Sequence, residues 1–285
     1  MELLRKANHP NVVQVYGWAA WTDSIALAME YLPGGKLSTR LLDADNKITS
    51  PLRLRFAAEI ADAISFLHTL TKSKRMTHSD IKPDNVLLTI DFHCKLADFG
   101  GAQFCSYTVQ ARQPNEVDSD RLQYTPIYAA PELFENAGGK PTRSADVYSY
   151  GLTVYMILTG KDPTETFSSL EEYVQAIRRG QRPDTSFIPE KRRSMTTRQA
   201  LAIADALESV MRQCWDHIPE ERPEIIAVRN QLQKLLRKIK QADITKCVSE
   251  ELERLNIQLP SHEEHKCAPL NQLDPITNTF AQGMR

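Results

Sequence analysis

The sequence predicts an α+β fold in which a small β-rich region precedes a larger helical region. Two runs rich in strand-forming residues, 12–16 and 25–29, lie near the N-terminus and are followed by the turn-forming Pro33-Gly34-Gly35. Apolar residues recur at helical spacing over 51–70, and helical periodicity dominates after Pro141. With 285 residues, the chain is long enough for a large buried core.

The helical region contains one segment that is apolar nearly all round. Residues 144–159 have this character, which predicts a buried helix, and Gly160 is placed to cap its C-terminus. Residues 98–135 show no sustained periodicity, which predicts a long functional loop or a disordered segment. Further helices are expected near 168–180, 199–215, 222–240 and 246–257, a helix end at 1–8, and short strands at 86–88 and 94–96.

The composition excludes several classes of protein. With 41% hydrophobic and 25% charged residues, the chain is neither wholly disordered nor a disulfide scaffold. A net charge of −1 and the absence of a basic stripe argue against nucleic acid as a partner. Five cysteines without a Cys-x-x-Cys pair favour free thiols, and we expect a cytoplasmic protein without a membrane segment. The oligomeric state stays open.

One stretch carries recognisable chemistry. It reads His78-Ser79-Asp80-Ile81-Lys82-Pro83-Asp84-Asn85, and Asp98-Phe99-Gly100 follows it. The pattern His-x-Asp-x-Lys-x-x-Asn should arise by chance about once in several hundred chains of this length. The stretch resembles the catalytic loop and metal-binding triplet of eukaryotic protein kinases.

This resemblance extends from residue 1 to about 240. It implies a protein-kinase-like fold with a complete helical C-lobe and a partial β N-lobe. The implied division is a partial N-lobe and hinge at 1–32, the C-lobe at 33–240, and a C-terminal helix with a mobile tail at 241–285.

The resemblance also implies a role for each polar residue of the motif. Asp80 would orient the acceptor hydroxyl and take its proton, while Lys82 would contact ATP and stabilise charge on the transferred phosphate. Asn85 and Asp98 would hold Mg²⁺, which prefers oxygen ligands. Taken singly, each of these residues could equally be a turn former between strands.

The nucleotide base would bind at the segment Met29-Glu30-Tyr31-Leu32, which resembles the gatekeeper and hinge of the family. The backbone of Glu30 and Leu32 would hydrogen-bond adenine, and Leu87 would lie under the ring. A methionine in an apolar strand is more often part of a core, so only its order among the other motifs favours the hinge assignment.

Further matches concern structure and substrate. Ala130-Pro131-Glu132 resembles the end of the activation segment, Asp146 the buried helix aspartate that braces the catalytic loop, and Arg222 the partner of Glu132. Lys82 and Thr125 follow the pattern of Ser/Thr-directed kinases, which implies a protein substrate with a serine or threonine acceptor. Cys214-Trp215 and Arg222-Pro223 resemble the tyrosine-kinase-like branch, near the Mos and receptor-interacting kinases.

Two features depart from the family pattern. Ser79 stands where the family usually has an arginine beside the catalytic aspartate, and no Gly-x-Gly-x-x-Gly motif occurs in the sequence. Aligning His9-Pro10-Asn11 with the family places the expected helix glutamate immediately before Met1, and no strand lysine is present. We therefore expect an N-terminally truncated kinase domain, with weak nucleotide binding and little or no turnover.

Three hypotheses remain open at this point. The chain is a Ser/Thr protein kinase by family, a catalytically dead pseudokinase-type interaction module, or a helical scaffold unrelated to kinases. Two smaller expectations concern residues that the motif does not include. His68, at the end of the first long helix, is expected to serve in packing, and Lys191-Arg192-Arg193 to be a solvated insert between helices.

Overall fold

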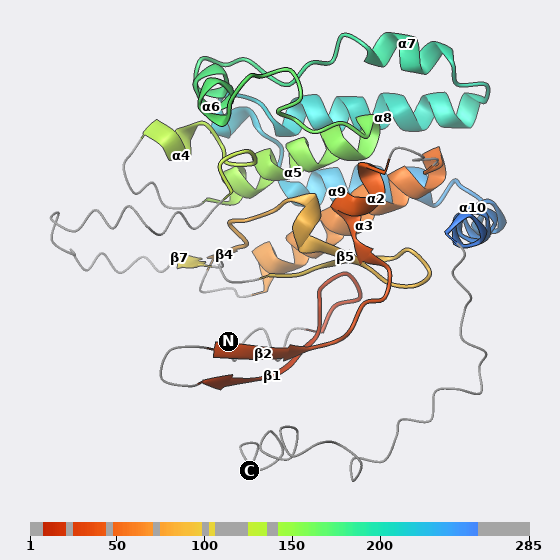
Figure 1. Cartoon of the computed structure of the whole chain (residues 1–285), viewed down its shortest axis with the longest axis horizontal. Coiled ribbons are helices and arrows are strands. Elements are labelled where there is room, and N and C mark those ends of the chain that lie inside the picture. The colour runs from red at the N-terminus through yellow and green to blue at the C-terminus, as the bar shows by residue number, and fades with distance from the viewer. Residues whose placement is uncertain are drawn as a thin grey trace, which may run out of the picture.

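The computed structural model describes residues 8–20, 25–43, 48–70, 75–98, 103–105, 125–135 and 142–255. The expected helix end at 1–8 lies almost entirely outside the described residues, as do Phe99, Gly100 and the tail beyond residue 255. The described residues form small sheets on one side of a larger helical body (Figure 1).

An antiparallel hairpin lies apart from the helical body, below it in Figure 1. It consists of β1 (Val15–Ala20) and β2 (Ile25–Met29), with Trp18 opposite Leu27. The sequence placed the first strand at 12–16. It begins later because the preceding segment pairs with another strand: the Val13 amide donates to the Leu96 carbonyl at 2.9 Å, and Leu96 donates to Asn11.

The remaining strands include β4 (Arg75–Thr77) and β5 (Val86–Leu88), which precede and follow residues 78–85, the segment with Asp80 and Lys82. β3 (Gly35–Lys36), β5 and β6 (Cys94–Leu96) form a sheet in the order β3-β5-β6, and β4 pairs with β7 (Gln103–Cys105). The turn before β3 touches β5 so closely that a Cβ atom on Gly34 would lie 2.5 Å from the Thr89 carbonyl oxygen. Only glycine therefore fits at this position.

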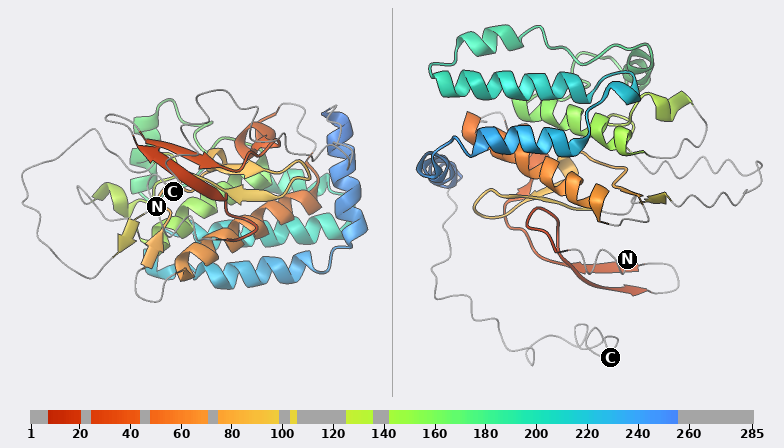
Figure 2. Two further views of the ribbon diagram at one scale, coloured as in Figure 1. Left: turned by 90° about the horizontal axis from the view of Figure 1, so that it is seen from below. Right: turned by 180° about the vertical axis from the view of Figure 1, so that it is seen from behind.

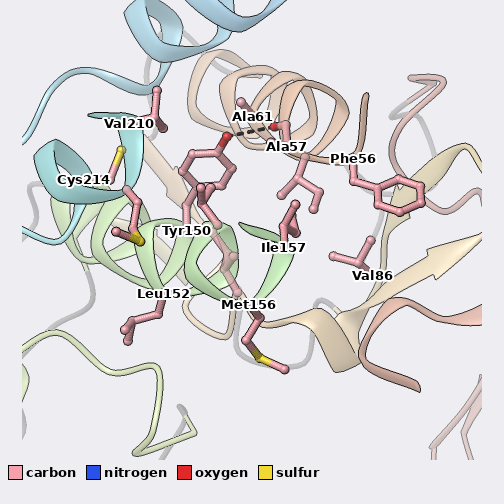
Figure 3. Close-up of a cluster of buried hydrophobic side chains, with 14 of the residues drawn as sticks. Phe56, Ala57, Ala61, Val86, Tyr150, Leu152, Met156, Ile157, Val210 and Cys214 are labelled. Atoms are coloured by element: carbon pink, nitrogen blue, oxygen red, sulfur yellow. Dashed lines mark hydrogen bonds between the residues drawn. The ribbon is translucent and has the colours of Figure 1, made fainter. Parts of the chain in front are cut away.

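Helices α3 (Ser50–Thr69), α5 (Arg143–Thr159), α8 (Arg198–Cys214) and α9 (Ile225–Leu236) build the main core. Every residue of α5 from Ala145 onward is buried, as its all-round apolar character predicts. Its ends are capped: the Thr142 side chain accepts from the Ala145 amide, and Gly160 adopts a left-handed φ of 73°. Figure 3 shows Tyr150 of α5 donating to the Ala57 carbonyl of α3, at 2.8 Å.

Shorter elements complete the helical body. They are α2 (Leu37–Leu41), η1 (Pro83–Asn85), α4 (Glu132–Glu135), α6 (Leu170–Arg178), α7 (Ile188–Arg193) and η3 (Pro219–Glu221). None of the described helices combines the length and apolar composition needed to cross a bilayer.

The last described helix, α10 (Gln241–Arg254), packs across the start of α3 and is the dark blue helix in Figure 2. It starts earlier than the predicted 246–257. Arg254 fastens its end by hydrogen bonds to the Asp43 carboxylate at 3.2 Å and to the buried Glu251. Residues 241–254 are therefore part of the folded body.

The contact between α5 and α8 depends on a glycine. A Cβ atom on Gly151 would lie 2.9 Å from the Trp215 backbone nitrogen and 3.0 Å from the Cys214 Cβ. We predict that Gly151→Ala lowers the free energy of unfolding by about 1–3 kcal/mol, because overpacking outweighs the gain in helix propensity. Chemical denaturation would measure the change. Ser209→Ala, at an exposed position of α8, is the control and should stay within about 0.5 kcal/mol of the parent chain.

Candidate functional site

The loop between β4 and β5 is held by one buried carboxylate. Asp146 of α5 is 2% exposed and accepts the backbone amides of His78 and Ser79, each at 2.9 Å. His68 of α3 donates its Nε2–H to the same carboxylate at 2.8 Å. The expectation that His68 serves only in packing is therefore wrong: its ring is buried because it binds Asp146.

The two consecutive amides reach one carboxylate because the backbone turns sharply. Ser79 has a φ of 73°, in the left-handed region that a serine adopts at a cost of about 1–2 kcal/mol. The hydrogen bonds to Asp146 offset this cost. Asp146 thus fixes the direction in which the following residue, Asp80, leaves the turn.

His78 connects the loop to the segment that carries Asp98. Its Nδ1 accepts the Asp80 amide at 3.3 Å, so its Nε2 carries the proton and donates to the Ala97 carbonyl at 3.0 Å. The Ala97 amide in turn donates to the Asn85 carbonyl at 2.8 Å. Because Ala97 is tied to both ends of the loop, the position of Asp98 is coupled to that of Asp80.

The Asp80 carboxylate accepts four hydrogen bonds. Lys82 Nζ and Asn85 Nδ2 donate to Oδ2 at 2.7 and 2.9 Å, and the Thr125 amide and hydroxyl donate to Oδ1 at 3.0 and 2.7 Å. Burial raises the pKa of Asp80, but the hydrogen bonds from Lys82 and Thr125 outweigh it and leave the pKa below its ordinary value. The group is therefore a carboxylate at neutral pH, oriented by its neighbours.

Thr125 enters the site from a distant part of the chain. It accompanies Asp80 because the end of its segment is anchored: the Tyr128 amide donates to Thr125, and Ser149 of α5 donates to the Tyr128 carbonyl at 2.7 Å. Further along, Glu132 receives two hydrogen bonds from Arg222, at 2.7 and 2.8 Å. In the sequence, Thr125 indicates only the substrate class, and no pattern there predicts its contact with Asp80.

Asn85 and Asp98 offer oxygen atoms that fit a hard divalent cation. The Asn85 amide nitrogen is used by the Asp80 backbone carbonyl, at 2.7 Å, and by the Asp80 carboxylate, which turns the amide oxygen away from Asp80. Asp98 is an exposed carboxylate with a left-handed φ of 58°. The described residues contain no group of three or more His, Cys, Asp or Glu residues suited to a metal. A cation here would need further oxygen ligands from substrate or water.

The four candidate base-binding residues lie at the end of the hairpin and on β5. Leu32 and the partly buried Leu87 share a small apolar cluster with Val13 and Ala97. The side chain of Glu30 is tied to Lys95 at 2.7 Å and to the Gln14 amide at 2.8 Å, which positions its backbone. Among the described residues, neither the Glu30 carbonyl nor the Leu32 amide has a hydrogen-bond partner. Met29, at the end of β2, is 40% exposed.

Comparison with known proteins identifies related chains. A family model described as "Protein kinase domain" matches residues 1–234. Human receptor-interacting serine/threonine-protein kinase 1 is 30% identical over 228 residues, which is 78% of this chain and 32% of that protein. Bovine receptor-interacting serine/threonine-protein kinase 2 is 28% identical over 269 residues, 93% of this chain and 47% of that protein. The chain thus spans less than half the length of these relatives.

The pKa values of two histidines near the site are shifted in opposite directions. Burial lowers the pKa of His78 below 6.5, and the hydrogen bond to Glu59 raises the pKa of His93, on the β5–β6 turn, above 6.5. Above pH 6.5 His78 leaves stability unchanged, and below it stability falls because the unfolded chain takes up the proton. The contribution of His93 is present at low pH and is lost as pH rises through its folded pKa.

NMR titration of the imidazole signals, assigned with His93→Gln, would measure both pKa values. A His78 signal that titrates at or above 6.5 would contradict the buried, neutral ring described here.

Proposed function

The chain belongs to the protein kinase family, and we propose that it is the catalytic domain of a Ser/Thr kinase of the tyrosine-kinase-like branch. It would transfer the γ-phosphoryl group of ATP to a serine or threonine hydroxyl of a protein substrate. The observation that carries this proposal is the Asp80 carboxylate, held by Lys82, Asn85 and Thr125. We divide the domain into a partial N-lobe and hinge at 1–32 and a C-lobe at 33–240, with 241–285 as a C-terminal extension.

The chain's own residues act mainly by position. Asp80 would accept a hydrogen bond from the acceptor hydroxyl, align it with the phosphoryl group and receive its proton as the new bond forms. Lys82 donates hydrogen bonds to Asp80 and Thr125, and its charge would stabilise the negative charge that develops on the transferred group. The Thr125 hydroxyl forms hydrogen bonds with both side chains and would hold them in this orientation.

The nucleotide would be held at two places. The Leu32 amide and the Glu30 carbonyl fit a donor–acceptor pair on the adenine edge, with Met29 beside the ring and Leu87 beneath it. Asn85 and Asp98 would hold Mg²⁺, whose chemistry is to neutralise the phosphate oxygens. We place the domain in the cytoplasm, a location that the free thiols of Cys94, Cys214 and Cys247 support.

A second candidate function is that of a pseudokinase-type interaction module. One observation within the motif favours it: Ser79 stands where the family usually has an arginine. The hairpin and the segment that follows it also expose apolar side chains suited to binding a partner, among them Trp18 at 57% and Tyr31 at 87%. Retention of Asp80, Lys82, Asn85 and Asp98 in one connected site favours the kinase.

Nucleotide binding separates the two functions. We predict that Mg²⁺–ATP binds weakly to the 285-residue chain, and that Asp98→Ala reduces this binding at least tenfold because a metal ligand is lost. Slow transfer to serine and threonine peptides should depend on Asp98 in the same way. Calorimetry and a radiolabelled phosphotransfer assay would measure both, with Asp91→Asn, an exposed carboxylate on the β5–β6 turn, as the control. Equal ATP binding by the parent and Asp98→Ala, or none by either, would favour the interaction module.

The hydroxyl of Thr125 provides a finer test. We predict that Thr125→Val, which keeps the shape but removes the hydroxyl, lowers phosphotransfer about 10- to 100-fold and leaves ATP affinity unchanged, because Thr125 contacts Asp80 and Lys82. Thr125→Ser should restore most of the rate. Equal rates for the valine and serine variants would show that the hydroxyl has no part in the reaction.

A further inference from the structure

A cavity of about 260 Å³ lies between α3, α5, α7 and α8, far along the helical body from the candidate site. Figure 1 shows α7 and α8 at the top of the molecule with α5 beneath them. Most of the lining is aliphatic and buried or partly buried: Ile48, Leu158, Met195, Ile203, Ala204 and Leu207. The sequence predicted a solvated insert where α7 forms the cavity's edge.

Two cationic side chains also line the cavity. Lys191 of α7 donates to the carbonyls of Leu158 and Thr159 at the end of α5, at 3.2 and 2.8 Å. Arg53 of α3 donates to the Ile48 carbonyl at 3.0 Å and to the Ile157 carbonyl. Lys191 forms no ion pair with a described carboxylate, since Asp205 and Glu208 of α8 pair instead with Arg192.

Positive charge therefore gathers beside an aliphatic hollow. Lys191 faces Arg53 from α3 and Lys161 from the segment after α5. Two acidic residues belong to the same elements: Glu190 precedes Lys191 on α7, and Glu165 forms an ion pair with Lys161. Burial, together with the charges of Arg53 and Lys161, lowers the pKa of Lys191 to about 8. An anion at this point would relieve the repulsion between the cations.

We propose that this cavity binds an aliphatic carboxylate of medium chain length, with its carboxylate on Lys191 and Arg53 and its chain among the aliphatic side chains. The ligand and the cavity are complementary. The carboxylate would accept charge-assisted hydrogen bonds from the cations, and the alkyl chain would be buried among the aliphatic side chains. At roughly 30 Å³ for each non-hydrogen atom, 260 Å³ holds about nine such atoms. The size fits octanoate rather than a long-chain fatty acid.

The proposal does not rest on kinase activity. None of the lining residues contacts Asp80, Asn85 or Asp98, and the binding can be measured without ATP. Its failure would leave the proposed phosphotransfer untouched, and failure of phosphotransfer would leave the cavity unchanged.

Calorimetry with octanoate tests the proposal on the full chain. We expect one site, and at pH 8 a net uptake of protons on binding, because a carboxylate raises the pKa of Lys191 from about 8. Titrations in two buffers with different ionisation enthalpies would show this uptake. Lys191→Gln should weaken octanoate about tenfold and leave the affinity for neutral 1-octanol unchanged.

Two further variants complete the design. Arg193→Gln removes an exposed cation from the same helix and should bind octanoate like the parent chain. Ala204→Phe fills the cavity and should block both octanoate and 1-octanol, with circular dichroism to verify that it folds. No octanoate binding, or equal octanoate binding by the parent, Lys191→Gln and Ala204→Phe, would overturn the proposal.

Discussion

The arrangement of the candidate site depends on the buried carboxylate of Asp146. A charge at this depth is costly unless it is fully hydrogen-bonded. Asp146 therefore constrains three partners at once: His68 of α3 and the amides of His78 and Ser79. With the left-handed turn at Ser79, both amides point at this carboxylate. The hydrogen bonds of this one carboxylate thus join two core helices to the loop that carries Asp80.

Further hydrogen bonds connect the loop that Asp146 holds to the candidate metal site. His78 donates to the Ala97 carbonyl, and the Ala97 amide donates to the Asn85 carbonyl. Asn85 and the neighbour of Asp98 are therefore both tied to this loop. A second anchor, the pair of the buried Arg222 and the partly buried Glu132, holds the end of the segment that brings Thr125 to Asp80. The Asp80 carboxylate lies where the two supports meet, which explains how a side chain on a loop is held by four hydrogen bonds.

The sequence predicted the elements that depend on local pattern. The long helix expected at 51–70 is α3 at Ser50–Thr69, and the buried helix at 144–159 is α5 with its cap at Gly160. Short elements such as α2 and α7 were missed because five or six residues carry too little periodicity. The contacts of His68 with Asp146 and of Thr125 with Asp80 span 78 and 45 residues, and such pairing is decided by tertiary packing. Only the resemblance placed Asp80, Lys82, Asn85 and Asp98 in one site before the fold was known.

The proposed acceptor half and the proposed nucleotide half of the candidate site differ in their support. The acceptor half, with Asp80 and Thr125, is braced by the helical core. The nucleotide half rests on the hairpin, which is joined to the rest through the pairing of residues 11–13 with Leu96 and through the ion pair of Glu30 with Lys95. Its apolar side chains are exposed, Trp18 at 57% and Leu27 at 41%, so the hairpin shares little apolar burial with the helical core. The weak ATP binding predicted above is therefore compatible with a proposed acceptor half whose hydrogen bonds at Asp80 are fully formed.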